Sequence, residues 1–113
     1  MHELGITENI VNIALTKAGE AQASRISRIN LVIGEMSGFV ADCIQFYFDS
    51  LSQDTIAQGA ALHFEIVPAQ LQCRNCSTVF TPKDTVWSCP ECSGQSVEIS
   101  KGRELYIESI EVE

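Results

Sequence analysis

The spacing of apolar residues along the chain predicts two amphipathic helices. Near the amino terminus, apolar residues three and four positions apart form one stripe of a helix that ends around Gly19. This stripe consists of Ile6, Ile10, Ile13, Ala14 and Ala18. The second run has the same spacing and consists of Val40, Cys43, Ile44, Tyr47, Phe48 and Leu51. Both patterns are typical of helices that pack one face against a core.

Three other segments alternate in hydrophobicity, as strands with one better-buried face do. They span residues 28–33, residues 62–67, where Pro68 ends the strand, and residues 105–112. Their expected apolar faces are formed by Ile29, Leu31 and Ile33, by Leu62, Phe64 and Ile66, and by Tyr106, Ile110 and Val112. We therefore expect an α+β fold with two helices packed on a small three-stranded mixed sheet.

Residues 71–96 differ in composition from the rest of the chain. They hold four of the five cysteines and few aliphatic residues, so they need a covalent or metal staple to stay folded. The full length of 113 residues allows one compact domain, or a small domain that carries a miniature one. We expect residues 1–70 and 97–113 to form one α/β domain and residues 71–96 to form an inserted zinc-ribbon-like domain, in which residues 78–80 and 85–87 make a short hairpin.

The spacing of four cysteines predicts a metal site. Cys73 and Cys76 form one C-x2-C pair, and Cys89 and Cys92 form another after a gap of twelve residues. Two turns of this kind supply four thiolates in a tetrahedral arrangement, which is the ligand set of a structural zinc site. Four thiolates leave no coordination position for water, so we expect a structural zinc ion and not a hydrolytic one.

Other interpretations of the cysteines remain open. Two disulfides or a thioredoxin-like dithiol are disfavoured by a reducing compartment and by the lack of a βαβ pattern around either pair. A rubredoxin-like iron centre uses the same four ligands. The fifth cysteine, Cys43, is interpreted as a small buried hydrophobe on the apolar face of the second helix, and a fifth metal ligand or a nucleophile is the alternative.

The charge of the chain narrows the choice of partners. Seven Lys and Arg residues face fifteen Asp and Glu residues, for a formal net charge of −8. Nucleic-acid binding depends on clustered basic residues, so we expect no nucleic-acid partner. The start of the chain does not resemble a signal peptide and no apolar run is long enough to span a membrane, so we expect a cytoplasmic protein. The sequence shows neither the residue order of a catalytic triad nor a phosphate-binding glycine loop, so we do not expect an enzyme.

The first three residues are a second candidate metal site. The amine of Met1, the His2 imidazole and the first backbone amides offer several nitrogens to one cation, in fused chelate rings. Nitrogen ligands in a planar arrangement favour nickel(II) or copper(II). A solvated histidine is the alternative, and His63 is a weaker candidate ligand. Glu3 fits equally well as an acid that the helix dipole favours in the first turn.

Together these motifs resemble those of the HypA family of hydrogenase nickel-incorporation proteins. The shared features are the initial Met1-His2-Glu3-Leu4, a helix directly after it, the Gly34-Glu35 turn and the paired C-x2-C motifs, and the resemblance covers the whole chain. It implies a metallochaperone, and so no enzyme, that carries nickel to the large subunit of a [NiFe] hydrogenase together with the HypB GTPase. It also implies a nickel-binding domain of two helices on three strands.

The resemblance also implies roles for individual residues. His2 is the expected nickel side-chain ligand, with backbone nitrogens of Met1, His2 and Glu3 beside it, and Glu3 also contacts partners. Zinc is held by Cys73, Cys76, Cys89 and Cys92. Urease maturation proteins as further partners, and a monomer or a weak homodimer, are left open. The competing functions are a zinc-ribbon module that binds proteins or nucleic acid and an iron electron carrier.

Overall fold

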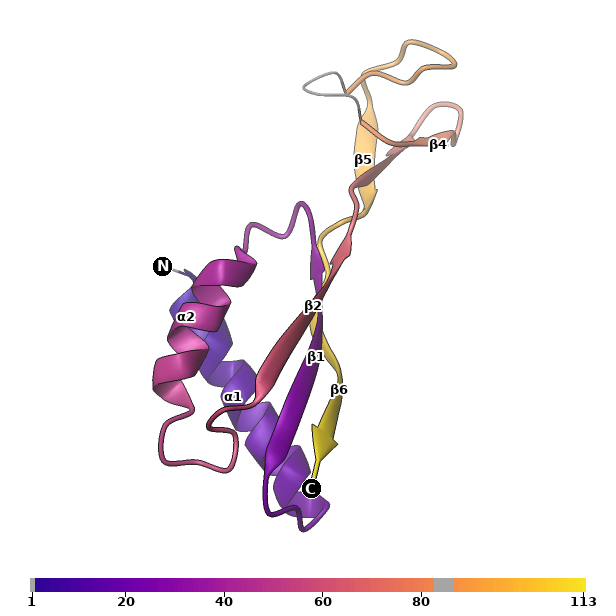
Figure 1. Ribbon diagram of the computed structural model, residues 1–113. Helices are drawn as coiled ribbons and strands as arrows, with labels where there is room; N and C mark the ends of the chain where they lie inside the picture. The colour runs from indigo at the N-terminus through magenta and orange to yellow at the C-terminus, as the bar shows by residue number, and fades with distance from the viewer. Residues whose placement is uncertain (1, 83–86) are drawn as a thin grey trace. The chain divides into compact units, whose positions relative to one another are not determined.

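The computed structural model describes the backbone of residues 2–82 and 87–113, and the side chains of residues 3–82 and 87–113. The chain divides into two compact units. The helical unit contains Met1–Val32, Phe39–Glu65 and Tyr106–Glu113, and the cysteine unit contains Ile33–Gly38 and Ile66–Leu105. The elements in chain order are α1 (His2–Glu20), β1 (Ile26–Gly34), α2 (Ala41–Leu51), β2 (Ala61–Val67), β3 (Gln70–Cys73), β4 (Val79–Phe80), β5 (Val97–Lys101) and β6 (Leu105–Val112), as Figure 1 shows.

Helix α1 confirms the first predicted helix and extends it to the start of the chain. Its buried stripe includes Ile10, Val11, Ala14 and Ala18, together with Thr7, whose hydroxyl donates a hydrogen bond to the Glu3 carbonyl. The prediction for Ile13 was wrong, because its side chain is 50% exposed. Buried positions three and four residues apart define one face of the helix, and Ile13 is rotated about 100° away from Ala14 on that surface.

Helix α2 confirms the second predicted helix but buries a narrower face than expected. Ile44 and Phe48, four residues apart, are its buried residues, and the helix packs against α1. Both helices lie on the same side of the sheet formed by β2, β1 and β6 (Figure 1). Cys43, predicted to be buried, is exposed. A side chain one position before Ile44 points about 100° away from the buried stripe, toward solvent.

Strand β1 is the central strand of the mixed sheet, which has the order β2-β1-β6. Its apolar positions were predicted correctly, since Ile29, Leu31 and Ile33 are fully buried, and Val32 on the other face is buried too. Strand β6 runs antiparallel to β1, because the Glu113 amide donates to the Arg25 carbonyl near the start of β1. A central strand that is covered by neighbours on both edges is expected to be the most apolar strand.

Strand β2 lies on the other edge of β1 and runs parallel to it. The Ile26 amide donates to the Ile56 carbonyl ahead of β2, and the Glu35 amide donates to the Val67 carbonyl at its end, so both chains advance in the same direction. Parallel neighbours need a long crossover connection, and α2 supplies it. The predicted mixed sheet under two helices is therefore the observed architecture of this part of the chain.

The expected apolar face of β6 was partly wrong. Tyr106 is 51% exposed and Val112 is also exposed, whereas Leu105, Ile107 and Ile110 are half-buried. The half-buried positions alternate as far as Ile107 and then skip to Ile110, so the strand does not keep one face inward along its length. As an edge strand it has a neighbour on one side only, and its burial pattern is therefore weaker than that of β1.

The cysteine unit has its own three-stranded sheet, of order β4-β3-β5. Both neighbours of β3 are antiparallel to it, and Leu71 in its middle is fully buried. In the predicted hairpin, residues 78–80 were expected to pair with residues 85–87. Thr85 and Val86 lie outside the described residues, so this pairing stays a prediction. Strand β4 pairs with β3, with Gln72 opposite Val79. Whether residues 71–96 fold as a domain of their own stays a prediction.

Two glycines allow a close backbone approach inside the cysteine unit. A Cβ atom added at Gly34 would lie 2.1 Å from the Gly102 carbonyl oxygen, and Gly102 itself has φ +115°. The same carbonyl accepts a hydrogen bond from the Met36 amide at 2.6 Å. Only a residue without a side chain fits at Gly34 in this conformation.

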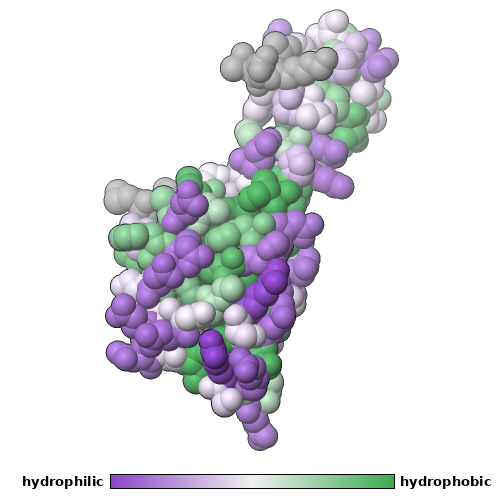
Figure 2. Space-filling view, in the orientation of Figure 1, coloured by the Kyte–Doolittle hydropathy of each residue, from purple (hydrophilic) through white to green (hydrophobic). Residues whose placement is uncertain are grey.

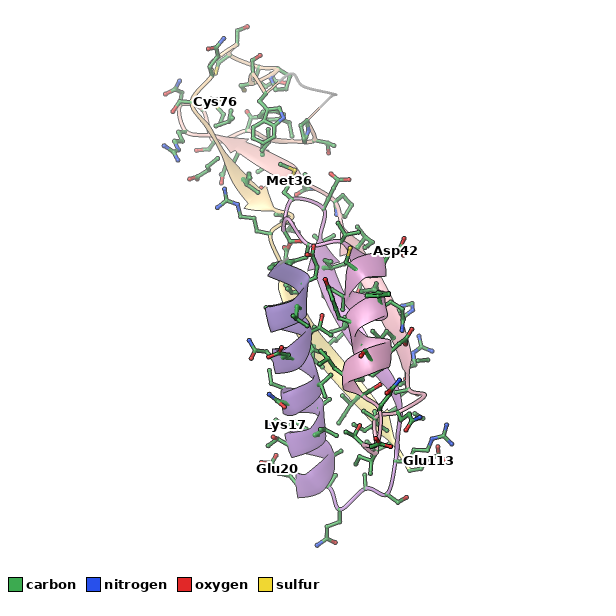
Figure 3. All side chains as sticks on the ribbon, turned by 90° about the vertical axis from the view of Figure 1, so that its left-hand side faces the viewer. Lys17, Glu20, Met36, Asp42, Cys76 and Glu113 are labelled. Atoms are coloured by element: carbon green, nitrogen blue, oxygen red, sulfur yellow. The ribbon has the colours of Figure 1, made fainter. Side chains whose placement is uncertain are left out.

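Charged side chains of both signs lie at the surface of the helical unit. Hydrophilic and hydrophobic residues are interspersed over the face of the helical unit that Figure 2 shows. Charged pairs on this unit are exposed, and an example is Lys17 with Glu20 at 3.5 Å on α1, both labelled in Figure 3. Among the described residues, no helix combines the length and the hydropathy that a membrane span requires.

Candidate metal centres

The four cysteines of the paired motif converge on one point of the cysteine unit. The Sγ atoms of Cys73, Cys76, Cys89 and Cys92 all lie within 4.8 Å of one another. The closest contacts join the two motifs, since Cys73 to Cys92 and Cys76 to Cys89 are both 3.5 Å apart. Cys76, labelled in Figure 3, lies in the loop between β3 and β4. The structure therefore brings together all four residues that the spacing singled out.

The first cysteine turn follows β3 directly and spans Cys73–Thr78. The Ser77 amide donates to the Cys73 carbonyl at 2.9 Å, and the Cys73 amide donates to the Thr78 carbonyl at 2.9 Å. These bonds close the chain around the two thiols, and they place Ser77 in the left-handed region with φ 64°. A short polar residue tolerates this region better than a branched or bulky one. The turn holds Cys73 inside and leaves Cys76 at the surface.

The second cysteine turn, Cys89–Gly94, repeats this construction. The Ser93 amide donates to the Cys89 carbonyl at 2.9 Å, and the Cys89 amide donates to the Gly94 carbonyl at 2.8 Å. Ser93 has φ 60°, close to the value of its counterpart in the first turn. Again the first cysteine is buried and the second, Cys92, is exposed. Two equivalent turns facing each other are the arrangement in which C-x2-C pairs hold one ion.

The thiols interact strongly in the absence of a cation. The hydroxyl of Thr78, its amide and then the Cys89 thiol lower the pKa of Cys76 to about 6. The Gly94 amide acts in the same direction on Cys92, but hydrogen bonds with the neighbouring thiols outweigh it and raise the pKa of Cys92 to about 12. One thiol thus ionises readily and its neighbour resists ionisation. A divalent cation removes this conflict, because it stabilises all four thiolates together.

The separations of the sulfur atoms fit tetrahedral coordination. Zinc–sulfur bonds of ~2.3 Å place the sulfurs of a tetrahedral site about 3.8 Å apart. The observed contacts of 3.5 Å and the outer limit of 4.8 Å bracket this value. They are far longer than the ~2.05 Å of a disulfide, and all five cysteines are free thiols here. The cluster therefore fits a four-thiolate zinc site.

The structure describes the amino-terminal candidate site only in part. Helix α1 begins at His2, and the amine of Met1 and the side chain of His2 lie outside the described residues. Glu3 is described, and its side chain is only 7% exposed. Its Oε2 atom accepts a hydrogen bond of 3.3 Å from the Val40 amide, the N-cap of α2. A carboxylate at this place complements the positive end of α2 and ties the start of the chain to that helix.

The two remaining candidates, Cys43 and His63, belong to the helical unit. Cys43 is an exposed residue of α2, and His63 is an exposed residue of β2. Among the described residues, neither belongs to a group of side chains able to share a metal ion. The sequence-based interpretation missed Thr78, whose hydroxyl lies 3.1 Å from the Cys76 sulfur. The serine that follows each C-x2-C pair was a visible sign that the two turns are alike.

Comparisons with known proteins agree with these features along the whole chain. The profile of one protein family, described as "Hydrogenase/urease nickel incorporation, metallochaperone, hypA", matches residues 1–112. A hydrogenase maturation factor HypA from Dehalococcoides mccartyi strain CBDB1 is 50% identical over 113 residues, which cover 100% of this chain and 95% of that protein. A second, from Caldanaerobacter subterraneus subsp. tengcongensis, is 43% identical over 114 residues, with 100% of both chains covered.

Two solved structures share the fold. A solution structure of a HypA protein matches with a TM-score of 0.77 at 26% identity, over 99% of this chain and 96% of the other. The solution structure of the nickel metallochaperone HypA from Helicobacter pylori matches with a TM-score of 0.67 at 25% identity, over 97% and 96% of the two chains. The family profile, the identity with full-length relatives and the shared fold lead to one conclusion: the chain belongs to the HypA family of nickel metallochaperones that act in hydrogenase maturation.

Proposed function

We propose that the amino-terminal residues bind the nickel that this protein carries. In this proposal the His2 imidazole is the side-chain ligand, and the amine of Met1 and the backbone nitrogens of His2 and Glu3 complete the site. A helix that begins at His2 does not use the His2 amide in its hydrogen-bond ladder, which supports this role. Glu3 would contact partners in addition. The carried nickel is then held at a chain end, from which it can be passed on.

The four cysteines have a different role in this proposal. Cys73, Cys76, Cys89 and Cys92 would hold a structural zinc ion, because four thiolates fill its coordination sphere and two of them are buried. Zinc bound in this way would join the two cysteine turns and stabilise the cysteine unit. Nickel would therefore be bound and passed on at one site of the chain, and zinc would be retained at another.

We further propose the partners and setting of this activity. The protein would act in the cytoplasm as a carrier and not as an enzyme, and would deliver nickel to the large subunit of a [NiFe] hydrogenase with a HypB GTPase. The observation that supports this most is the family match over residues 1–112, which includes both the Met1-His2-Glu3 start and the paired cysteine motifs. The family description names urease as well, so urease maturation is a second setting.

Changes at the chain end test the nickel site. We expect the His2→Ala variant, or the addition of a Gly-Ser extension before Met1, to abolish tight nickel binding measured by isothermal titration calorimetry, because each change removes a nitrogen ligand. Binding should also weaken as the pH falls through ~8 to ~6.5, the range in which a free amine and an imidazole gain protons.

The control for this experiment is His63→Ala, which changes the other histidine of the chain and should leave nickel binding intact. Zinc content measured on the same samples should stay unchanged in all variants. Nickel binding that survives both the His2 substitution and the extension would contradict the proposed site.

A further inference from the structure

The two cysteine turns have matching backbones but differ in one side chain. Both turns use the same pair of backbone hydrogen bonds and place a serine in the left-handed region directly after the second cysteine. The residue after that serine is Thr78 in the first turn and Gly94 in the second. The amide of this residue lowers the pKa of the second cysteine of its own turn in both cases. The turns therefore differ at this position by the threonine side chain.

The threonine side chain reaches a sulfur atom. The Oγ1 atom of Thr78 lies 3.1 Å from the Sγ atom of Cys76. When the sulfur is a metal-bound thiolate it can only accept a hydrogen bond, so the hydroxyl must donate. Hydrogen bonds of this type withdraw charge from the sulfur and are stronger than those between neutral groups. Cys76 thus has a side-chain hydrogen-bond donor from its own turn, the Thr78 hydroxyl.

Cys92 cannot receive the same hydroxyl. A Cβ atom built at Gly94 would lie 3.2 Å from the Cys92 sulfur and 3.0 Å from the Asn75 side-chain nitrogen, so a larger residue does not fit without movement. The second turn accordingly offers the Gly94 amide and no side-chain donor at this position. The charge on a Cys92 thiolate is less dispersed than that on a Cys76 thiolate.

Among the four sulfurs of the cluster, a reagent can reach only those of Cys76 and Cys92. Cys73 and Cys89 are 1% and 2% exposed, whereas Cys76 and Cys92 are exposed. Reaction with electrophiles requires both an accessible sulfur and a concentrated negative charge on it. In the zinc-bound site all four sulfurs are thiolates. Both conditions then hold at Cys92, and the second is weakened at Cys76 by the Thr78 hydroxyl.

We propose that Cys92 is the reactive sulfur of the zinc site, where soft carbon electrophiles modify the protein first. The inference rests on the proposed four-thiolate site. In the reaction with iodoacetamide, the Cys92 sulfur forms a bond to the methylene carbon while the carbon–iodine bond breaks and iodide leaves. The thiolate becomes a neutral thioether, which is a poor zinc ligand. Alkylation at this single position therefore opens the coordination sphere and makes the site prone to lose its metal.

The test uses the full chain, loaded with zinc, in a Cys43→Ser background that removes the exposed thiol outside the site. Zinc is measured before reagent is added, so a failure of the zinc assignment is recognised separately, as protein without zinc. The protein is then treated with less than one equivalent of iodoacetamide near pH 7. Peptide mass spectrometry ranks the modified cysteines, and a chromogenic chelator follows zinc release.

We expect Cys92 to be alkylated about tenfold faster than Cys76, since a hydrogen bond to a charged acceptor has effects of this order. Zinc release should follow the modification of Cys92. The Thr78→Val variant should raise the rate at Cys76 toward that of Cys92, and the Thr78→Ser variant, which keeps the hydroxyl, should restore the difference. Equal rates at both cysteines, faster reaction at Cys76, or an unchanged ratio in Thr78→Val would overturn the proposal.

Discussion

At Gly34 the backbone passes so close to Gly102 that no side chain fits between them. We expect Gly34→Ala to destabilise the protein by ~1–3 kcal/mol or more, because the added methyl group overlaps a carbonyl oxygen that lies 2.1 Å from its position. Chemical denaturation measures the loss. The matched control is Gly19→Ala in α1, where nothing lies within 4 Å and alanine favours the helix, so its stability should not fall. Equal stability of both variants would contradict the close approach.

Single residues also show where sequence patterns were sufficient. The four cysteines were identified correctly as one cluster, because ligand spacing is a local property of the chain. Cys43 and Ile13 were expected to be buried and are exposed. Both neighbour a buried residue in a helix, and periodicity alone does not define how wide the buried face is. The contact of Thr78 with Cys76 depends on turn geometry, which the apolar pattern does not report.

Among the elements, we expect the cysteine turns and the sheet β4-β3-β5 to depend on the proposed zinc ion. A structural zinc site contributes ~10–16 kcal/mol of apparent binding free energy in small peptides, far more than the burial of Leu71 in this sheet can supply. We expect Cys89→Ala to release zinc, measured by inductively coupled plasma mass spectrometry, and to make the cysteine unit sensitive to proteolysis. The helical unit should keep its circular dichroism signal, since its buried residues come from other elements.

The control for this variant is Cys43→Ala, which should retain zinc because Cys43 lies outside the cluster. Full zinc content in the Cys89→Ala protein would show that four thiolates are not the ligand set. A loss of helix signal together with zinc would show that the helical unit also depends on the metal.

The elements differed in how well they could be predicted. The helices and the strands β1, β2 and β6 follow from periodicity, because each is long enough to show two or more repeats of its pattern. Strands β3 and β5 have four and five residues and were not predicted. Their pairing is fixed by the cysteine turn and by the antiparallel partner, and these are tertiary constraints. The pairing of β4 with β3 was not predicted either.

For the whole molecule, charge is the property that sequence alone describes best. With a formal net charge of −8, the protein should show no salt-sensitive affinity for DNA or RNA in fluorescence anisotropy at physiological ionic strength. Affinity that falls steeply with added salt would favour the zinc-ribbon nucleic-acid module over a metal carrier. A charge of this sign is compatible with cationic cargo and with basic surfaces on partner proteins.

We propose that one chain holds two metals at separate sites, zinc at the four cysteines and nickel at the amino terminus. Metal analysis tests this on the purified protein, without any extension before Met1, before and after nickel is added and the excess removed. We expect about one zinc per chain in both samples and about one additional nickel in the second. Iron in place of zinc, zinc displaced by the added nickel, or no nickel retained would contradict the two-metal proposal.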